Sequence, residues 1–370
     1  MLVMEIYFVQ DKKGIFRLVD LDLRPRRGPL PARDATMNPP LHYAVVGAGI
    51  AGLSCARALT EAGVRVTVLD KSRGPAGRMS TRRGDGWACD HGAQYFTARD
   101  PRFQAEVTRW LAAGVAARWQ PRLTVFGADG RREALGEAGA TLARHVGIPR
   151  MTAPARYLTD GLDLRLQATV NALYSYDHGW ELATAEHGRL PEAFDGVLLA
   201  VPAPQAAPLL QPVAPDLAAV AGAARMQACW ALMARFDAPL ALDFDAAFVN
   251  DGPLRWIARD TSKPGRTGME TWTLHASAAW SEAHLEDTPE RVASALIAAF
   301  RALGGEAPVV WSAHRWRYAI TESAVDEGYV WHAEDGVGLC GDWLNGGRVE
   351  GAWLSGHALA HCVLAEMALA

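Results

Sequence analysis

The most regular pattern of apolar and polar positions begins at residue 41. Residues 43 to 46 form a short apolar run, and a glycine-rich segment follows from residue 47 to residue 52. An amphipathic stretch continues to residue 62, and residues 64 to 69 are almost all apolar or β-branched. Short apolar runs favour strands, while spacings of three and four favour helices. The pattern therefore predicts a strand, a glycine turn, a helix and a second strand, which together form a βαβ unit.

Later stretches predict two kinds of structure. Apolar runs at residues 164 to 173, 197 to 201 and 337 to 340 predict strands, the first in a small antiparallel hairpin with residues 180 to 185. Residues 103 to 160 are rich in Ala and Arg at helical spacing. Residues 222 to 325 alternate as in an antiparallel sheet, with one helix at residues 289 to 303 that Asp287 or Thr288 would cap.

These blocks predict two interleaved domains, because 370 residues are too many for one compact core. We expect a discontinuous nucleotide-binding domain at residues 41 to 102, 161 to 221 and 326 to 370. The substrate domain would comprise residues 103 to 160 and 222 to 325. The Arg- and Pro-rich residues 1 to 40 are expected to be a poorly ordered appendage. Met37 directly precedes the first strand, so one hypothesis is that translation begins there.

Composition excludes several classes of protein. Half of the residues are hydrophobic and 21% are charged, as in a globular protein with a large core. A net charge of −4 gives no global field for nucleic acid or anionic lipid. No apolar stretch is long enough to span a membrane. The five cysteines contain no C-x-x-C pair, so we expect no metal site, and a reducing cytoplasm fits best.

The first chemical motif is the glycine-rich segment Gly47-Ala48-Gly49-Ile50-Ala51-Gly52, which matches G-x-G-x-x-G. Gly47 permits the tight turn, Gly49 lets the backbone approach a pyrophosphate, and Gly52 lets the helix pack closely on the sheet. Asp70 ends the next strand, 18 residues after Gly52, where it would bind an adenosine ribose. Together these features predict a dinucleotide site.

Two further segments favour FAD over NAD. A second glycine turn places Arg78 where it would cover the pyrophosphate, and Gly341-Asp342 ends a late strand. A carboxylate at Asp342 would bind a ribityl hydroxyl, which NAD lacks. The helix beginning near Gly351 would direct its positive end toward the flavin N1 and C2 carbonyl. We expect the cofactor to contact Gly47, Gly49, Ile50, Ala51, Gly52, Asp70, Lys71, Gly77, Arg78, Met79, Gly92, Ala93, Gln94, Tyr95, Gly341, Asp342, Glu350, Gly351 and Ala352.

From residue 43 onward, the chain resembles the FAD-dependent amine oxidase superfamily, and within it most resembles the renalase branch. The resemblance rests on Asp70-Lys71, Gly77-Arg78-Met79, residues 90 to 96 (DHGAQYF), Trp316-Arg317, Gly341-Asp342 and Glu350-Gly351-Ala352. It implies an α/β fold with a Rossmann-type, p-hydroxybenzoate-hydroxylase-like FAD-binding domain and an inserted mixed α+β substrate domain.

The resemblance also implies an activity. Renalase-like enzymes remove a hydride from isomeric dihydronicotinamide dinucleotides, and dioxygen then reoxidises the flavin to give hydrogen peroxide. By this analogy residues 90 to 94 would line the flavin, with Gln94 near its reactive face. Family members that bind FAD covalently use a cysteine in a glycine-rich context that Cys340 lacks. We therefore expect non-covalent FAD.

Candidates on the substrate side are aromatic and basic residues. Aromatic faces would stack on a nicotinamide and arginines would hold a pyrophosphate, although Trp in a β-rich domain is more often core. The candidates are Trp272, His275, Trp280, His314, Arg315, Trp316, Arg317 and Tyr318, with catalytic roles assigned to Gln94, His275 and Trp316. The basic loop with Arg255, Arg259, Lys263 and Arg266 is expected to be a solvated loop, although it would steer an anionic dinucleotide if it faced the site.

Two other functions remain open at this point. A true amine oxidase would need two aromatic residues that flank the flavin, and Trp316, Tyr318 and Trp343 are available for such a cage. A flavin-binding scaffold or sensor without turnover is the third reading. The sequence leaves the regioisomer, the preference for NAD or NADP, and the oligomeric state undetermined.

Overall fold

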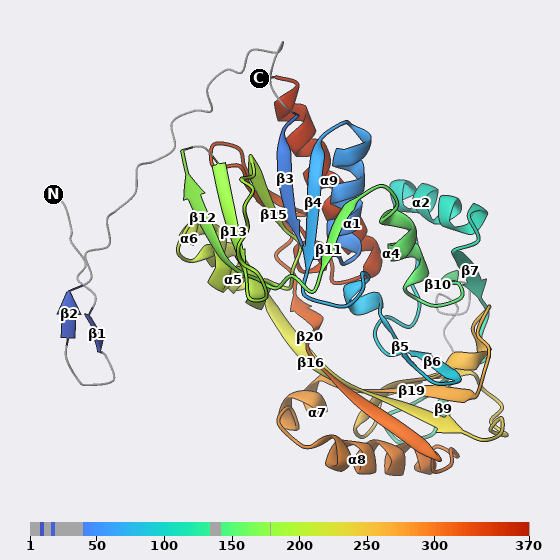
Figure 1. Ribbon diagram of the computed structural model, residues 1–370. Coiled ribbons are helices and arrows are strands. Elements are labelled where there is room, and N and C mark those ends of the chain that lie inside the picture. The colour runs from blue at the N-terminus through green and yellow to red at the C-terminus, as the bar shows by residue number, and fades with distance from the viewer. Residues whose placement is uncertain (1–7, 11–15, 19–39, 134–141, 178, 370) are drawn as a thin grey trace.

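A six-stranded sheet forms the centre of one half of the protein (Figure 1). The computed structural model describes residues 8–10, 16–18, 40–133, 142–177 and 179–369. Every neighbouring pair in this sheet is parallel except β22 and β21. In spatial order the strands are β11 (Asp163–Leu166), β4 (Arg65–Asp70), β3 (His42–Val46), β15 (Gly196–Leu199), β22 (Val337–Leu339) and β21 (Val330–His332).

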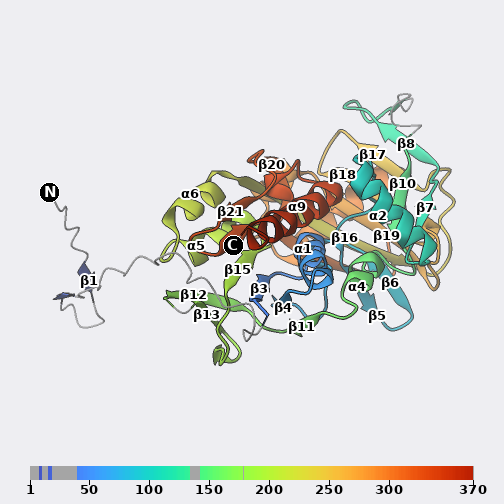
Figure 2. The ribbon, with the colours of Figure 1, turned by 90° about the horizontal axis from the view of Figure 1, so that it is seen from above.

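Both faces of this sheet are covered. Side chains alternate between the faces of a strand, so Val45, Val66 and Val68 pack beneath the helices α1 (Ile50–Glu61) and α9 (Val349–Met367). These two helices lie side by side in the view from above (Figure 2). The opposite face packs against a small antiparallel sheet and two short helices. These are β12 (Val170–Tyr176), β13 (Gly179–Thr184), β14 (Gly188–Arg189), α5 (Ala203–Leu210) and α6 (Pro215–Ala223).

A seven-stranded sheet forms the other half of the protein. Helices α7 (Ala278–Ala283) and α8 (Pro289–Ala302) lie on its outer side in Figure 1, and α8 contributes four side chains to its core. Thr288 caps α8 by accepting a hydrogen bond from the backbone N–H of Arg291. The strand order is β20 (Val310–Ser323), β16 (Arg225–Phe236), β19 (Glu270–Ala276), β18 (Leu254–Arg259), β17 (Ala246–Val249), β8 (Leu123–Phe126) and β9 (Arg132–Glu133). We propose that the two large sheets correspond to the two domains expected from the sequence.

Shorter elements connect the two sheets. The hairpin of β5 and β6 lies near the junction of the two halves, with η1 just before it in the chain, while η2 lies between β18 and β19. Helix α4 lies beside α1 and helix α2 beside α9, and the pair β7 and β10 lies beyond α2. Their bounds are η1 (Gly77–Met79), β5 (Thr81–Gly84), β6 (Trp87–Asp90), α2 (Pro101–Ala112), β7 (Ala116–Trp119), β10 (Arg144–Gly147), α4 (Ala153–Leu158), η2 (Asp260–Ser262) and η3 (Asp342–Leu344).

Two expectations about local structure were wrong in part. The apolar run at residues 164 to 173 is divided, because Gln167 has φ +55° and interrupts the strand. Its first half, β11, pairs with β4 in the central sheet, and only its second half, β12, forms the hairpin with β13. Residues 103 to 160 were expected to be helical, but four strands lie there beside α2 and α4. Tertiary pairing overrides helical spacing in such short segments.

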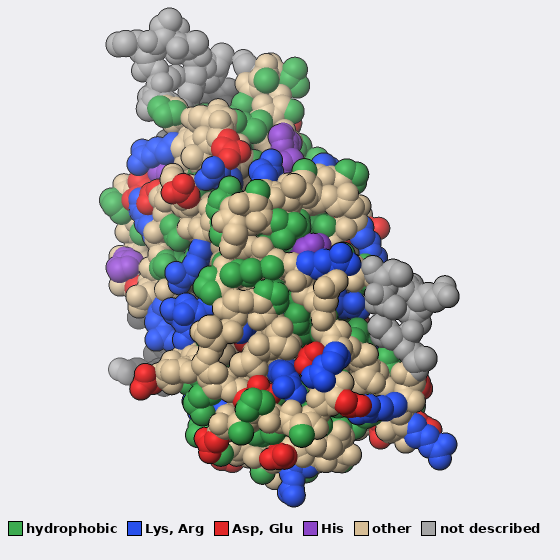
Figure 3. Space-filling model, turned by 90° about the vertical axis from the view of Figure 1, so that its right-hand side faces the viewer, with side chains coloured by type: hydrophobic (Ala, Val, Ile, Leu, Met, Phe, Trp, Pro, Cys, Tyr) green, Lys and Arg blue, Asp and Glu red, His purple; other side chains and the backbone are tan. Residues whose placement is uncertain are grey.

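The N-terminal appendage falls largely outside the described residues. Within it, β1 (Phe8–Gln10) and β2 (Phe16–Leu18) pair as antiparallel strands. In the described part of the chain, every helix is too short or too polar to cross a membrane. Basic and acidic side chains are interspersed on the face shown in Figure 3, in keeping with the small net charge.

Candidate active site

A large cavity lies where the two sheets meet. Its volume is about 2390 Å³, and its lining comes from the glycine turn before α1, the second glycine turn, residues 91 to 97, the start of α9 and strands of the seven-stranded sheet. Every residue predicted to contact FAD lines this cavity except Gly52 and Gly351. These two serve close packing, since a Cβ on them would lie 2.0 Å from the Gly47 carbonyl oxygen and 1.7 Å from the Asn345 carbonyl oxygen.

The N-terminus of α1 opens into the cavity. Gly49 is its N-cap and offers no side chain, so the first backbone N–H groups of the helix have no side-chain cap at this position. A Cβ built on Gly49 would meet nothing within 4 Å, while Gly47 adopts φ +110°. Asp70 accepts hydrogen bonds from the backbone N–H groups of Ala48 at 2.6 Å and Ser72 at 2.7 Å. The first crossover thus presents a helix N-terminus without a side-chain cap beside a fixed carboxylate.

The N-terminus of α9 reaches the same cavity from the end of the chain, again without a side-chain cap. Just before it, Asp342 accepts hydrogen bonds from Arg78 at 2.9 and 2.5 Å and from Thr321 at 3.2 Å. Glu350 accepts hydrogen bonds from the backbone N–H groups of residues 99 and 100, at 2.6 and 2.7 Å. The carboxylate of Glu350 is therefore engaged in holding the loop before α2.

The turn at residues 90 to 95 forms one wall of the cavity. The amide nitrogen of Gln94 donates to the backbone carbonyl groups of Asp90 at 2.5 Å and Gly92 at 3.1 Å, so this amide is bonded to the turn itself. The carbonyl oxygen of His91 accepts hydrogen bonds from the rings of His275 at 3.1 Å and Trp316 at 2.9 Å. The three residues with predicted catalytic roles therefore meet at this one turn.

An aromatic cluster beside this turn carries no charge near neutral pH. His91 stacks on Trp316 with ring centroids 5.0 Å apart and meets the edge of His314 at 4.9 Å. Burial, together with His314 and Arg82, lowers the pKa of His91 to about 3. Burial also lowers the pKa of His275 and of His314 to about 4, with Arg82 assisting at His314. The Nδ1 atom of His91 is buried without a hydrogen-bond partner among the described residues.

Comparison with known proteins identifies the family. The sequence profile described as flavin containing amine oxidoreductase matches residues 135–364, which is more than half of the chain. The chain belongs to this family. A profile of the NAD(P)-binding Rossmann-like domain matches residues 45–111. Members of the family are FAD-dependent oxidoreductases, so FAD is the cofactor.

Individual relatives in this family match only in part. The hydroxyneurosporene desaturase of Rubrivivax gelatinosus is 42% identical over 137 residues, which are 32% of this chain and 25% of the desaturase. The L-amino acid oxidase Lm29 of Lachesis muta is 50% identical over 60 residues, which are 16% of this chain and 11% of the oxidase. The chain thus matches a quarter or less of the length of these relatives.

Solved structures share the fold. Cyclohexylamine oxidase from Brevibacterium oxydans superposes with a TM-score of 0.70 at 14% identity, covering 89% of this chain and all of that chain. A putrescine oxidase bound to putrescine gives 0.66 at 14% identity, covering 88% of this chain and all of that chain. At such identities the likeness shows the Rossmann-type fold with its second domain.

The residues present fit the flavin of this family. Two helix N-termini without side-chain caps face one cavity, and such termini bind anionic or electron-rich groups. The open space above Gly49 leaves room for a pyrophosphate against the backbone. Cys340 is fully buried and does not line the cavity, and the pKa of the cavity-lining Cys229 is raised to about 12 by burial. No cysteine of the chain is thus a reactive thiolate at this site.

Some residues expected on the substrate side lie elsewhere. Trp272 is fully buried in the core of the seven-stranded sheet, so its assignment to the substrate site was wrong. Trp280 packs against the same core and stacks on His284. Arg315 and Arg317 line the cavity, but both form ion pairs with Glu286. Flat aromatic side chains suit a core as well as a ligand, so the sequence could not separate the two.

The basic loop after β18 was also misjudged. Lys263 and Arg266 were expected in a solvated loop, yet their side chains are 0% and 4% exposed and both pair with Asp90. Asp260, three residues before Lys263, is 1% exposed and pairs with it at 2.7 Å. The separation of Asp260 and Lys263 by three residues is the local sequence pattern that could have indicated an ion pair here. Their partner Asp90 lies far away in the sequence, so only the tertiary fold reveals the cluster.

Proposed function

We propose that this protein is an FAD-dependent oxidase that removes a hydride from an isomeric dihydronicotinamide dinucleotide. Dioxygen would be the final acceptor and would give hydrogen peroxide. When bound, FAD supplies the two-electron acceptor. Residues of the chain would hold it: the turn from Gly47 to Ala51 and Arg78 at the pyrophosphate, Asp70 at the adenosine ribose, and Asp342 with the start of α9 at the flavin end.

The observation that carries this proposal is the charge of the cavity. Twelve Arg and Lys residues line it, against the three carboxylates Asp70, Asp342 and Glu350. Each of these carboxylates already has protein partners. FAD brings only two phosphates, so a positive excess remains that favours a second anionic molecule. A dinucleotide with its own pyrophosphate meets that requirement, whereas an ammonium ion would be repelled.

The aromatic wall beside the turn at residues 90 to 95 is a second argument for a dihydronicotinamide substrate. The stacked pair of His91 and Trp316 offers a flat, uncharged surface for a nicotinamide ring. Arg82 lies beside it, bonded to the ring of His314 at 3.3 Å, and its buried Nε has no partner among the described residues. Hydride removal by a flavin requires orientation over the ring and no strong base, so a neutral wall is suitable.

An amine substrate is the second candidate. Its support is the fold shared with the cyclohexylamine and putrescine oxidases, together with an aromatic wall at Trp316. An amine would have to bind in its neutral form, because the cavity is basic. A scaffold or sensor without turnover is less well supported. The cavity is large enough to hold a substrate beside the cofactor, and a scaffold would not need that space.

Anaerobic reduction of the holoenzyme tests the proposal. The purified protein is mixed with borohydride-generated dihydronicotinamide isomers, with ordinary NADH, or with cyclohexylamine and putrescine, and bleaching of the flavin absorbance is followed. Rapid bleaching by the isomers alone is expected. Bleaching by amines alone would establish the amine oxidase, and no bleaching by any donor would favour the scaffold. Release of hydrogen peroxide on admitting air checks the acceptor.

A further inference from the structure

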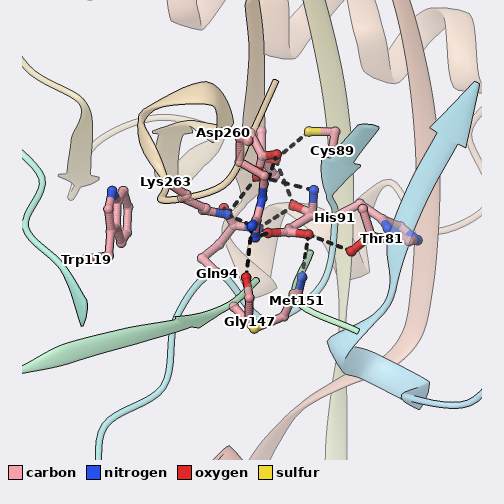
Figure 4. A network of polar contacts seen from close by, with 12 residues as sticks. Thr81, Cys89, His91, Gln94, Trp119, Gly147, Met151, Asp260 and Lys263 are labelled. Carbon is pink, nitrogen blue, oxygen red and sulfur yellow. Dashed lines mark hydrogen bonds and ion pairs between the residues drawn. The ribbon is translucent and has the colours of Figure 1, made fainter. Parts of the chain in front are cut away.

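A cluster of four charged side chains lies buried behind the cavity wall (Figure 4). The side chains of Asp90, Asp260, Lys263 and Arg266 are 0%, 1%, 0% and 4% exposed. Lys263 Nζ lies 2.7 Å from Asp260 Oδ1 and 3.2 Å from Asp90 Oδ2, and Arg266 donates to the same Asp90 oxygen at 2.5 Å. Two cations and two anions make the cluster electrically neutral.

The third hydrogen bond of Lys263 reaches the cavity wall. An ammonium group has three donors, and the third donates to Gln94 Oε1 at 3.2 Å. The other end of that amide donates to the carbonyl groups of Asp90 and Gly92. Lys263 does not line the cavity, whereas residues 91 to 97 do. Lys263 therefore acts on the wall through Gln94 and Asp90, and through Asp260, which accepts a hydrogen bond from the backbone N–H of Asp90 at 3.2 Å.

Three distant segments meet at this cluster. Asp90 Oδ1 accepts hydrogen bonds from Thr81 at 2.6 Å and from the backbone of Met151 at 3.1 Å, while Arg266 donates to the Gly147 carbonyl at 2.8 Å. Lys263 and Arg266 follow η2 in the seven-stranded sheet half of the protein. The cluster thus fixes the wall of the cavity with respect to the second sheet.

Burial makes this cluster expensive. Removing ions from water costs several kcal/mol for each ion, so such clusters are weak contributors to stability and often serve to specify one arrangement. Burial by itself would raise the pKa of Asp90, but Lys263 and Arg266 outweigh it and hold this pKa below its usual range. For Lys263, burial is outweighed by Asp260 and Asp90, which raise its pKa. For Asp260, burial and the neighbouring Asp90 raise the pKa.

The wall is held from its other side as well. His275 and Trp316 both donate to the carbonyl oxygen of His91, and a Cβ on Gly92 would lie 2.0 Å from the Arg78 carbonyl oxygen. The turn therefore lies between the Arg78 segment, the aromatic cluster and Lys263, with little freedom to move. Loss of one support would let it shift at the surface that faces the cofactor.

We propose that Lys263 is a positioning residue that, through Gln94 and Asp90, fixes the turn at residues 91 to 95 against the flavin. This inference rests on the proposed placement of the flavin along that turn. It is independent of which substrate the enzyme oxidises, because its readouts are properties of the bound cofactor.

Two variants, one that unbalances the charge of the cluster and one that restores the balance, separate positioning from stability. K263M leaves the cluster with one uncompensated negative charge, whereas K263M/D260N is neutral again. We expect K263M to lower the melting temperature and the double variant to recover most of it. In the double variant the flavin absorption spectrum and midpoint potential stay displaced from the wild type, and kcat with the identified substrate stays lower by roughly 10- to 100-fold. Recovery of the spectrum and the midpoint potential together with stability would overturn the proposal.

A third variant avoids the risk that the cluster variants fail to fold. Q94M keeps all four charges and removes the acceptor of Lys263 together with the two hydrogen bonds that this amide donates to the turn. It should reproduce the displaced spectrum and potential. A wild-type spectrum and potential in Q94M would overturn the proposal.

The matched control is R259M/E270Q, which removes another ion pair of the same sheet, 13% and 6% exposed, away from the cavity lining. It should lower the melting temperature and leave the flavin spectrum and potential unchanged. An equal displacement of the flavin spectrum and midpoint potential in this control would show that loss of any buried ion pair disturbs the flavin. That result would overturn the specific role of Lys263. Because the flavin spectrum and the midpoint potential are measured without a substrate, failure of the dinucleotide assay leaves these two readouts intact.

Discussion

The guanidinium of Arg78 forms two hydrogen bonds with the carboxylate of Asp342, a residue 264 positions further along the chain. Arg78 belongs to the second glycine turn, and Asp342 lies just before the last helix. Their pairing therefore joins an early and a late segment of the chain, and both residues line the cavity. Asp342 is 7% exposed and Arg78 31%, so the pair is sheltered without being fully desolvated.

Asp342→Asn should weaken FAD binding while the protein remains folded. Hydrogen bonds to charged groups contribute about 1.5–3 kcal/mol, which corresponds to a roughly 10- to 100-fold higher Kd for FAD. Titration of the apoprotein with FAD, followed by fluorescence, measures this change. The control is Asp243→Asn, which breaks a similar two-bond pair with the exposed Arg132. An unchanged Kd in Asp342→Asn would remove this residue from the cofactor site.

Gly49 and Gly47 should respond to alanine in different ways. A Cβ on Gly49 meets no protein atom, so Gly49→Ala should fold with an unchanged melting temperature but bind FAD poorly. Gly47→Ala should lose stability, because the residue adopts φ +110° and its Cβ would lie 2.7 Å from the Ala200 carbonyl oxygen. Gly222→Ala, at an open surface position of α6, is the neutral control. Normal FAD affinity in Gly49→Ala would contradict the proposed pyrophosphate site.

Stability should fall as the solution becomes acidic. The pKa values of His91, His275 and His314 are lowered to about 3, 4 and 4 from the usual 6.5, so the unfolded chain takes up these protons first. Their contribution is therefore complete above pH 6.5 and is lost as the pH falls toward 4. Each proton that the unfolded chain binds and the folded protein does not bind lowers the free energy of unfolding by up to about 1.4 kcal/mol for each unit that the pH falls.

Urea unfolding of the wild type and His275→Gln between pH 7.5 and 4.5 measures this effect. Glutamine can still donate to the His91 carbonyl, so the variant should fold and show a shallower dependence on pH. Parallel curves for the two proteins would show that His275 has the same pKa in the folded and the unfolded state and would contradict this prediction.

Arg82→Met should impair binding of an anionic substrate. Arg82 lies at the neutral aromatic wall, and its buried Nε has no hydrogen-bond partner in the described part of the chain. Its loss should raise KM roughly 10-fold or more with little effect on FAD affinity. Steady-state kinetics with the dihydronicotinamide isomers test this. Arg131→Met, in an exposed hairpin where the side chain is 87% exposed, should behave like the wild type. A KM that rises for amines instead would favour the second candidate.

FAD should be released when the protein is unfolded. Cys340 is fully buried beside Cys55 and away from the cavity, so no covalent bond to the flavin is expected there. After denaturation and ultrafiltration, the yellow colour should pass through the membrane. Flavin that stays with the polypeptide, detected by mass spectrometry, would contradict this.

Local sequence patterns determined the first crossover. Residues 43 to 70 carry their own strand, helix and turn signals, and the glycines have roles that follow from their backbone alone. The strand, helix and turn formed where they were predicted. Likewise Thr288 capped α8, because a cap depends on residues within one turn.

Only the tertiary structure decided which polar residues are buried. Lys263 and Trp272 were both misplaced, since a charge or an indole ring takes its role from partners that lie far away in the sequence. The division of residues 164 to 173 was decided in the same way, by pairing with β4 on one side of Gln167 and β13 on the other. Periodicity records which face of an element is apolar, whereas the contacts between elements decide what that face meets.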